Sequence, residues 1–280
     1  MIRLNNSEFI YEGIMLDDTG HYAFDKLKDF PTDLLCLTKD TSGVHESNDI
    51  TYVYGYRFND NVPKDLQKDF RNALKHEFDN SDLFYDDSVY DFVEDGVFAL
   101  DRYKRLEDFK VLITVRPTSG EDSLLDYIST IIMDYTQTGF LTFGLLKKLC
   151  SDVAFDEEKA FNALKNTDKY GNMSDSEIRK IVHKITKQLA RTVRTNPDEL
   201  FQIKRYSPVL ARVGFSSFLK FKNKFEEDIY RNLENGTEVL ICDDFVTSGS
   251  TLSEMKSFLT SINPNNRVTA FALINQQRQY

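Results

Sequence analysis

Residues 239–251 read VLICDDFVTSGST. Four apolar residues, Val239 to Cys242, have the pattern of a strand that is buried on both faces, and two carboxylates follow them. A short loop rich in hydroxyl groups then leads into the amphipathic segment 251–262, which we expect to be a helix. Open α/β sheets bind ligands outside the carboxyl ends of their strands. The stretch therefore predicts a strand, loop and helix of an α/β domain, with a ligand site at the loop.

The residue types in this stretch suit a phosphorylated sugar. Backbone N–H groups and hydroxyls of the loop can turn toward a phosphate, and the positive end of the next helix favours an anion. A glycine permits a tight turn and the close approach of that anion. Asp243 and Asp244 provide acceptors for two neighbouring ribose hydroxyls, or for the water shell of Mg²⁺. The loop residues in question are Thr247, Ser248, Gly249, Ser250 and Thr251.

The stretch resembles the motif with which type I phosphoribosyltransferases bind 5-phosphoribosyl-1-pyrophosphate (PRPP). It matches the hydrophobic run, the acidic pair, Thr247, Gly249 and Thr251. The resemblance implies that Asp243 and Asp244 contact the ribose and Mg²⁺ and stabilise the ribosyl cation, while the loop holds the 5-phosphate. It also implies a pentosyltransferase of nucleotide metabolism, which moves a 5-phosphoribosyl group to a nitrogenous base and releases pyrophosphate. PRPP or a nucleoside monophosphate is the expected ligand.

Two shorter pieces lie where the family places further parts of the site. A turn after an apolar segment resembles the pyrophosphate-binding loop, with Arg116, Thr118, Ser119 and Gly120 as its candidate residues. Lys148, or its neighbour Lys147, resembles a lysine that reaches the pyrophosphate. Relatives that act on 6-oxopurines carry an acidic residue where this chain has Thr247, so the chain is more similar to the orotate and competence-associated types. The acceptor base stays open.

The rest of the chain alternates between predicted strands and helices, as expected for parallel strands joined by helical crossovers. Strands are predicted over 50–56, 109–115, 140–146, 238–242 and 267–274. Helices are predicted from 63, over 89–103, 124–135, 178–193, 225–233 and 251–262. Ser174 and Glu177 have the spacing of a capping box before the fourth of these helices. The pattern predicts a doubly wound, mostly parallel α/β sheet.

The resemblance covers less than half of the chain. We expect residues 106–280 to form the phosphoribosyltransferase-like domain, with a helical insertion at about 150–220, and residues 1–105 to form an α+β cap. Members of the family that the chain resembles usually have a flexible catalytic loop and short strands at this place, where this chain has the predicted helical insertion. Lys204, Arg205 and Arg212 are candidates to act from it, or are surface charge. The alternative function is therefore a regulatory module that binds PRPP or a nucleotide without turnover.

The composition of the chain limits the classes of partner that it is expected to bind. The formal net charge of −10 argues against a general nucleic-acid binder. The three cysteines lack metal or disulfide spacing and are expected to be buried thiols, and the four histidines lack metal spacing. Apolar runs long enough to span a membrane are missing from the sequence. We expect a soluble, cytoplasmic protein, in which the amino-terminal region forms a homodimer or binds a protein partner.

Overall fold

The computed structural model divides the chain into two compact units. One, the sheet unit, comprises Met1–Gly144 and Asn223–Tyr280, and the other, the helical unit, comprises Leu145–Lys222. The structure describes residues 10–16, 22–27, 35–39, 44–47, 50–58, 64, 67, 68, 70, 71, 74, 86–115, 123–136, 139–247 and 249–276.

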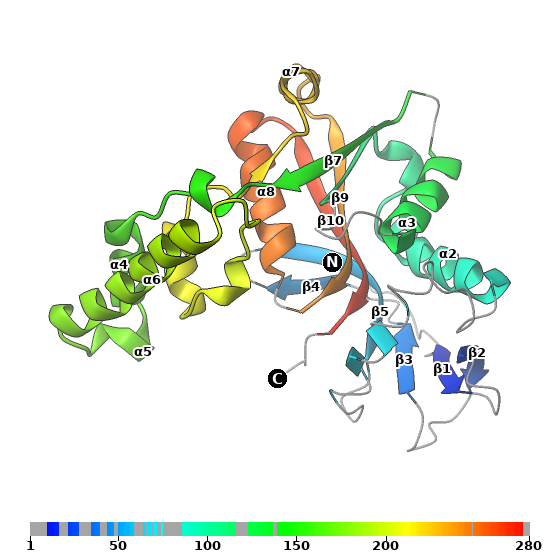
Figure 1. Ribbon diagram of the computed structural model, residues 1–280. Coiled ribbons are helices and arrows are strands. Elements are labelled where there is room, and N and C mark those ends of the chain that lie inside the picture. The colour runs from blue at the N-terminus through cyan, green and yellow to red at the C-terminus, as the bar shows by residue number, and fades with distance from the viewer. Residues whose placement is uncertain are drawn as a thin grey trace. The chain divides into compact units, whose positions relative to one another are not determined.

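The sheet unit is built on a mixed sheet whose centre is parallel (Figure 1). The parallel centre has the order β5-β10-β9-β6, from β5 (Ile50–Phe58), β10 (Arg267–Asn275), β9 (Glu238–Val246) and β6 (Val111–Val115). The antiparallel strands are β1 (Ile10–Leu16), β2 (Tyr22–Leu27), β3 (Leu35–Lys39) and β4 (Val44–Ser47), of which β3 and β4 pair with β5. β7 (Leu141–Lys147) follows β6 in the strand order and leads into the helical unit. These pairings confirm the predicted α/β class with a mostly parallel core.

Helices cover both faces of this sheet. Figure 1 shows α8 (Ser250–Ile262) on one side of β9 and β10, and α2 (Asp86–Tyr103) and α3 (Ser123–Asp134) on the other. The apolar residues predicted to mark α3 are buried, among them Leu124, Ile128 and Ile132 at 0% exposure. Between α2 and β6 lies the short 3₁₀ helix η1 (Leu106–Asp108). The helices thus enclose the central strands, whose side chains form the main core.

β5 comes from the part of the chain that we assigned to an amino-terminal cap, and it pairs in parallel with β10. α2 packs on it at very short range, because a Cβ atom on Gly55 would lie 2.8 Å from the Gly96 Cα. Beside this contact the Tyr56 ring stacks on Phe92 at 4.2 Å, and its hydroxyl donates to the Phe92 carbonyl at 2.8 Å. Two glycines facing each other therefore let α2 seat on the sheet.

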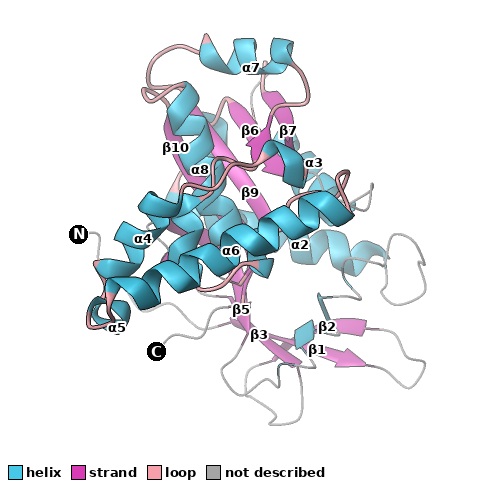
Figure 2. Ribbon diagram, turned by 60° about the vertical axis from the view of Figure 1, so that its left-hand side comes forward, coloured by secondary structure: helices cyan, strands magenta, loops and turns pink. Residues whose placement is uncertain are grey.

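The helical unit holds α4 (Glu157–Lys165), α5 (Asp168–Gly171) and α6 (Asp175–Thr195) (Figure 2). Its strand β8 (Leu219–Lys220) pairs with the end of β7, and its 3₁₀ helices are η2 (Cys150–Asp152), η3 (Ile203–Arg205) and η4 (Val209–Gly214). Aromatic rings fill its core, with Phe201 stacked on Tyr206 at 5.3 Å and in edge contact with Phe215 at 4.9 Å. The predicted capping box of Ser174 and Glu177 is present at the start of α6.

Several boundaries differ from prediction. β9 was expected to end at Cys242 but runs to Val246, because β10 continues beside it as far as Asn275. α7 (Lys224–Arg231) ends before Leu233, and Phe225, expected on its apolar face, is 72% exposed. Of the helix expected from residue 63, Phe70 and Leu74 are described as helical and fully buried. Among the described residues, no helix combines the length and the apolar character needed to cross a membrane.

Candidate functional site

The strand order of the sheet unit reverses between β6 and β9. From β6 the chain passes through α3 to β7 on one side, and from β9 it passes through α8 to β10 on the other. Because β6 and β9 are parallel, the segments that leave them emerge at the same edge of the sheet. In doubly wound proteins, ligands bind at such a reversal, outside the carboxyl ends of the strands.

The acidic pair lies at this edge, inside the last part of β9 rather than after it. The pairing of β6 with β9 ends at Thr114 and Cys242, so Asp243 is the first residue of β9 beyond that ladder. Asp243 is half-buried, whereas Asp244 is only 3% exposed. A backbone N–H fixes each carboxylate, since that of Asp244 donates to Asp243 Oδ1 at 3.1 Å and that of Phe245 donates to Asp244 Oδ1 at 2.6 Å. Asp243 is therefore the carboxylate more accessible to a ligand.

Cys242 directly precedes the acidic pair and does not share its exposure. Burial, reinforced by the charge of Asp243, raises the pKa of the Cys242 thiol well above its usual range. Burial also raises the pKa of Cys150, with a further contribution from Glu199. Both are buried free thiols, as predicted, and the neutral thiol is a poor nucleophile. The side chain of Cys36 lies outside the described residues.

The loop after β9 turns sharply into α8 at Gly249. This residue has a φ of +68° and a ψ of 0°, a left-handed conformation that favours glycine, as the sequence predicted. Thr247 before it is exposed, and Ser250 and Thr251 form the first turn of α8. Gly249 supplies no capping side chain and the first turn of α8 carries no acidic residue, so the positive end of the helix keeps its attraction for an anion.

Of the residues predicted to hold the pyrophosphate, the structure describes only Lys148 and its neighbour Lys147. Arg116, Thr118, Ser119 and Gly120, and Ser248 in the main loop, lie outside the described residues. Lys148 belongs to the helical unit, where its Nζ donates to the Ser217 carbonyl at 2.8 Å.

The cations proposed to act from the insertion have contacts within the helical unit. Arg212 Nε donates to the Tyr206 carbonyl at 2.8 Å, and burial lowers the pKa of Arg212. Arg205 forms an ion pair with Glu199. The side chain of Lys204 is outside the described part of the chain. These contacts give Arg205 and Arg212 structural roles in their own unit.

A buried polar contact that we did not predict lies next to the loop. Asn275 pairs with Val246 across the ends of β10 and β9, and its side chain is 2% exposed. Tyr52 donates its hydroxyl to Asn275 Oδ1 at 3.1 Å, and burial raises the pKa of Tyr52. In the sequence, this contact was indicated only by Asn275, a polar residue at the end of an apolar strand. The contact links β5 to the carboxyl end of β10 and so supports the edge on which the loop stands.

The described residues include no group of three or more His, Cys, Asp or Glu side chains arranged to hold a metal ion. Asp243 and Asp244 nevertheless fit Mg²⁺ in another way. Mg²⁺ prefers oxygen donors, keeps several of its waters and commonly shares substrate phosphates with one or two carboxylates. Asp243, a half-buried carboxylate beside the loop that the sequence predicts to bind phosphate, matches that requirement.

No protein-family model matches the sequence, and no curated protein has a sequence that matches it. The family resemblance therefore depends on residues 239–251 and on the position of that stretch in the sheet.

Proposed function

We propose that the chain binds PRPP with Mg²⁺ at the β9–α8 loop and transfers its 5-phosphoribosyl group to a nitrogenous base, on a fold of the type I phosphoribosyltransferase kind. One observation carries the proposal. The stretch that resembles the PRPP motif lies where the strand order reverses, and its glycine adopts the left-handed turn that starts α8. The motif thus lies at the point in the strand order where doubly wound sheets bind ligands.

The loop would hold the 5-phosphate. The backbone N–H groups at the start of α8 and the hydroxyls of Thr247, Ser250 and Thr251 provide the donors, and the helix end adds positive potential. Gly249 removes the side chain that would otherwise stand in the turn. Since only the native chain has this arrangement, ligand binding should stabilise it.

The acidic pair would act on the ribose. As pyrophosphate leaves C1 the ribose gains positive charge, and preorganised carboxylates stabilise that charge without reorganisation. Asp243 would accept hydrogen bonds from the ribose hydroxyls, while Asp244, being buried, would position the backbone and add its field. Mg²⁺, when bound, neutralises charge on the leaving pyrophosphate.

The acceptor is proposed not to be a 6-oxopurine. Thr247 occupies the position where an acidic group would manage the purine N7 proton, and a hydroxyl is not a base near neutral pH. Turnover measured with a panel of bases tests this selectivity. Rapid use of hypoxanthine or guanine would contradict it.

Binding is tested by the melting temperature with and without PRPP and Mg²⁺. Gly249→Val should remove the ligand-induced rise, because its side chain enters the phosphate turn. Gly236→Val is the matched control, since Gly236 has a φ of +83°, meets no atom within 4 Å of an added Cβ, and lies before the other end of β9. Both variants carry the strain of a positive φ, of about 1–2 kcal/mol. A shift that persists in Gly249→Val would refute the phosphate assignment.

Catalysis is tested by pyrophosphate release from PRPP beside calorimetric affinity. The double variant Asp243→Asn, Asp244→Asn should lose on the order of 10²-fold or more in turnover and much less in binding, since the charge matters most in the transition state. Asp126→Asn, Asp134→Asn, on the exposed side of α3, makes the same change in charge and should retain activity. Undiminished turnover in the first variant would falsify the catalytic role. Binding without any turnover in the wild type would leave a PRPP-binding regulatory module.

A further inference from the structure

The negative charge of the chain is distributed very unevenly. The helical unit, residues 145–222, contains 16 Lys and Arg against 9 Asp and Glu, a net charge of +7. The sheet unit contains 19 against 36, a net charge of −17. The net charge of the whole chain, which argued against binding to nucleic acid, therefore conceals a basic unit. Such an uneven distribution of charge is typical of proteins that bind a polyanion.

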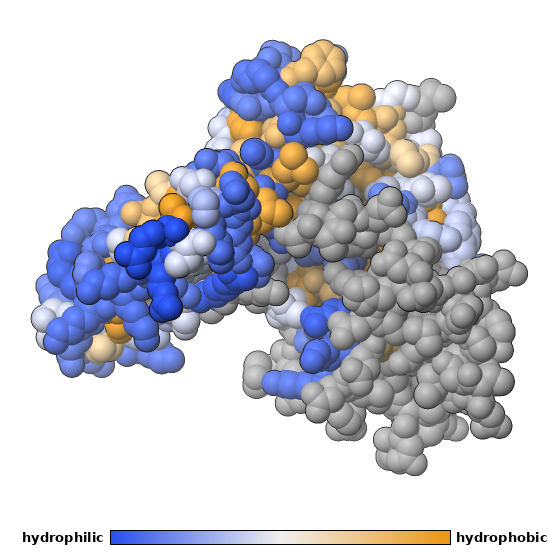
Figure 3. Space-filling view, in the orientation of Figure 1, coloured by the Kyte–Doolittle hydropathy of each residue, from blue (hydrophilic) through white to orange (hydrophobic). Residues whose placement is uncertain are grey.

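Most of the basic residues of α6 form one stripe. At 3.6 residues per turn, five of them fall on the face opposite the buried side chains Ile178, Val182, Ile185 and Leu189. All five are exposed: Lys180, Lys184, Lys187, Arg191 and Arg194. The stripe is about 21 Å long, with a cation every 4.5–6 Å of helix axis. Figure 3 shows mostly hydrophilic residues over α4, α5 and α6.

Within the described part of the chain none of the five members of the stripe forms an ion pair, and Glu177 is the carboxylate within electrostatic range of Lys180. Other cations of the unit do form ion pairs, since Arg179 pairs with Glu158 at 2.6 Å and Lys165 with Asp175 at 3.0 Å. Like charges at i,i+3 and i,i+4 positions destabilise a helix. The stripe of cations therefore does not contribute to the stability of the helix.

A hollow of about 600 Å³ adjoins the stripe between α4 and α6. Phe161, Arg179, Lys180 and His183 line it, together with Glu157. The Arg179 guanidinium lies over the Phe161 ring, 4.5 Å from its centre. Planar guanidinium and aromatic groups are the surfaces on which unpaired bases stack.

We infer that α6 and this hollow bind a single strand of nucleic acid, with the phosphates along the stripe and a base on the exposed Arg179 guanidinium, which Phe161 supports from below. A linear array of cations is complementary to a linear polyanion. A membrane surface fits less well, because the apolar face of α6 is already buried in the unit and cannot insert. The inference uses residues of the helical unit alone and is independent of the proposed transferase site.

The test is fluorescence anisotropy of the full chain with labelled RNA and DNA single strands of about 16 nucleotides, over about 50–200 mM salt. With five phosphates neutralised, the slope of log K against log salt should be about −3.5, which is about a 100-fold loss of affinity over that range. Lys184→Glu, Lys187→Glu should reduce the slope by about 1.4 or more. Because Phe161 is buried, the stacking step is tested with Arg179→Ala. This variant should weaken single-strand binding, and the slope should fall by no more than about 0.7, the contribution of one phosphate contact.

Lys159→Glu, Lys169→Glu is the matched control, because it makes the same change in charge at exposed lysines on α4 and α5. It should retain nearly all the affinity. Equal losses in the two double variants, or the absence of salt-dependent binding, would overturn the inference. So would stripe-dependent binding to phosphatidylserine vesicles, or stripe-dependent dimerisation, with no binding to either oligonucleotide. PRPP binding measured in parallel keeps the two proposals separate.

Discussion

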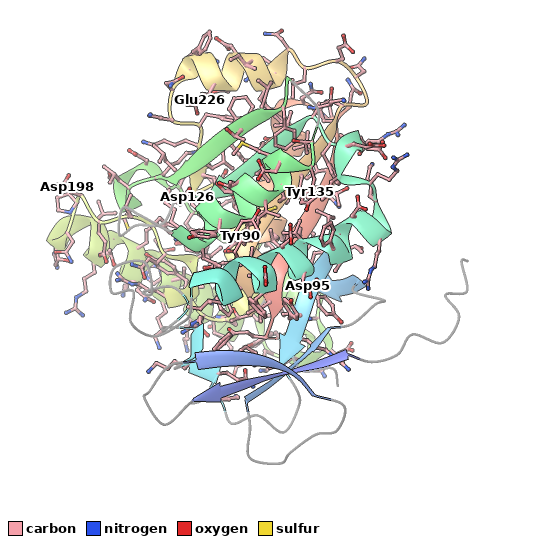
Figure 4. All side chains as sticks on the ribbon, turned by 90° about the vertical axis from the view of Figure 1, so that its right-hand side faces the viewer. Tyr90, Asp95, Asp126, Tyr135, Asp198 and Glu226 are labelled. Carbon is pink, nitrogen blue, oxygen red and sulfur yellow. The ribbon has the colours of Figure 1, made fainter. Side chains whose placement is uncertain are left out.

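The sheet unit and the helical unit have net charges of opposite sign. The sheet unit exposes carboxylates, among them Asp91 and Asp126, on α2 and α3, the helices on the side that Figure 4 presents to the viewer. Tyr135 donates its hydroxyl to Glu94 Oε1 at 2.7 Å, and this hydrogen bond raises the pKa of Tyr135. The helical unit instead exposes a row of cations with no such partner. The overall net charge of −10 thus hides two units of opposite net charge.

The strongest test of this comparison is whether the units keep their structure separately. Phe201 is fully buried among the rings of the helical unit, so Phe201→Ala should destabilise that unit by about 3–5 kcal/mol. Hydrogen exchange should then accelerate over residues 145–222 and leave β9 and β10 protected. Phe225→Ala, at an exposed phenylalanine, should change neither unit. Equal loss of protection in both units would show that they unfold together.

A smaller effect is expected at the start of α6. Ser174→Ala removes the capping hydroxyl and should cost the helical unit about 1 kcal/mol, whereas Ser176→Ala on the exposed first turn should cost little. Hydrogen bonds from the Ser174 hydroxyl and N–H lower the pKa of Glu177. Because this pKa is lowered on folding, the contribution is present above the ordinary Glu pKa of about 4.3 and is lost as pH falls through the lowered value. In urea denaturation the difference between wild type and Ser174→Ala should shrink in acid to the part contributed by the hydrogen bond from the Glu177 N–H to the Ser174 hydroxyl. A difference that does not change with pH would contradict the contribution of the Glu177 carboxylate.

The smallest effect concerns the stripe itself. Lys184→Glu replaces repulsion from Lys180 and Lys187 by attraction, and each such pair is worth about 0.2–0.5 kcal/mol. The variant should therefore be more stable than the wild type by about 0.5 kcal/mol, with Lys184→Gln between them. At about 1 M salt the difference should vanish, because screening then acts within a few ångströms. Urea midpoints at both salt concentrations measure it. A destabilised variant would mean that Lys184 has a structural partner.

Local signals in the sequence were sufficient for most elements. The apolar run and hydroxyl-rich loop of residues 239–251 predicted β9, the turn at Gly249 and α8, and Ser174 with Glu177 predicted the start of α6. Those signals depend on neighbours within a few positions, so a single sequence contains them. α4 was missed because its nine residues are too few for a clear period.

What the sequence determined by itself was the residue chemistry: an acidic pair, a loop rich in hydroxyl groups, and the number of charges in each segment. The tertiary structure decided the geometry. It extended β9 past Cys242 by pairing it with β10, placed Tyr52 against Asn275 across 223 positions of sequence, and put the five cations of α6 opposite its buried face. Each of these depends on which distant segments pack together, and that is settled by the burial of the whole core and not by any local pattern.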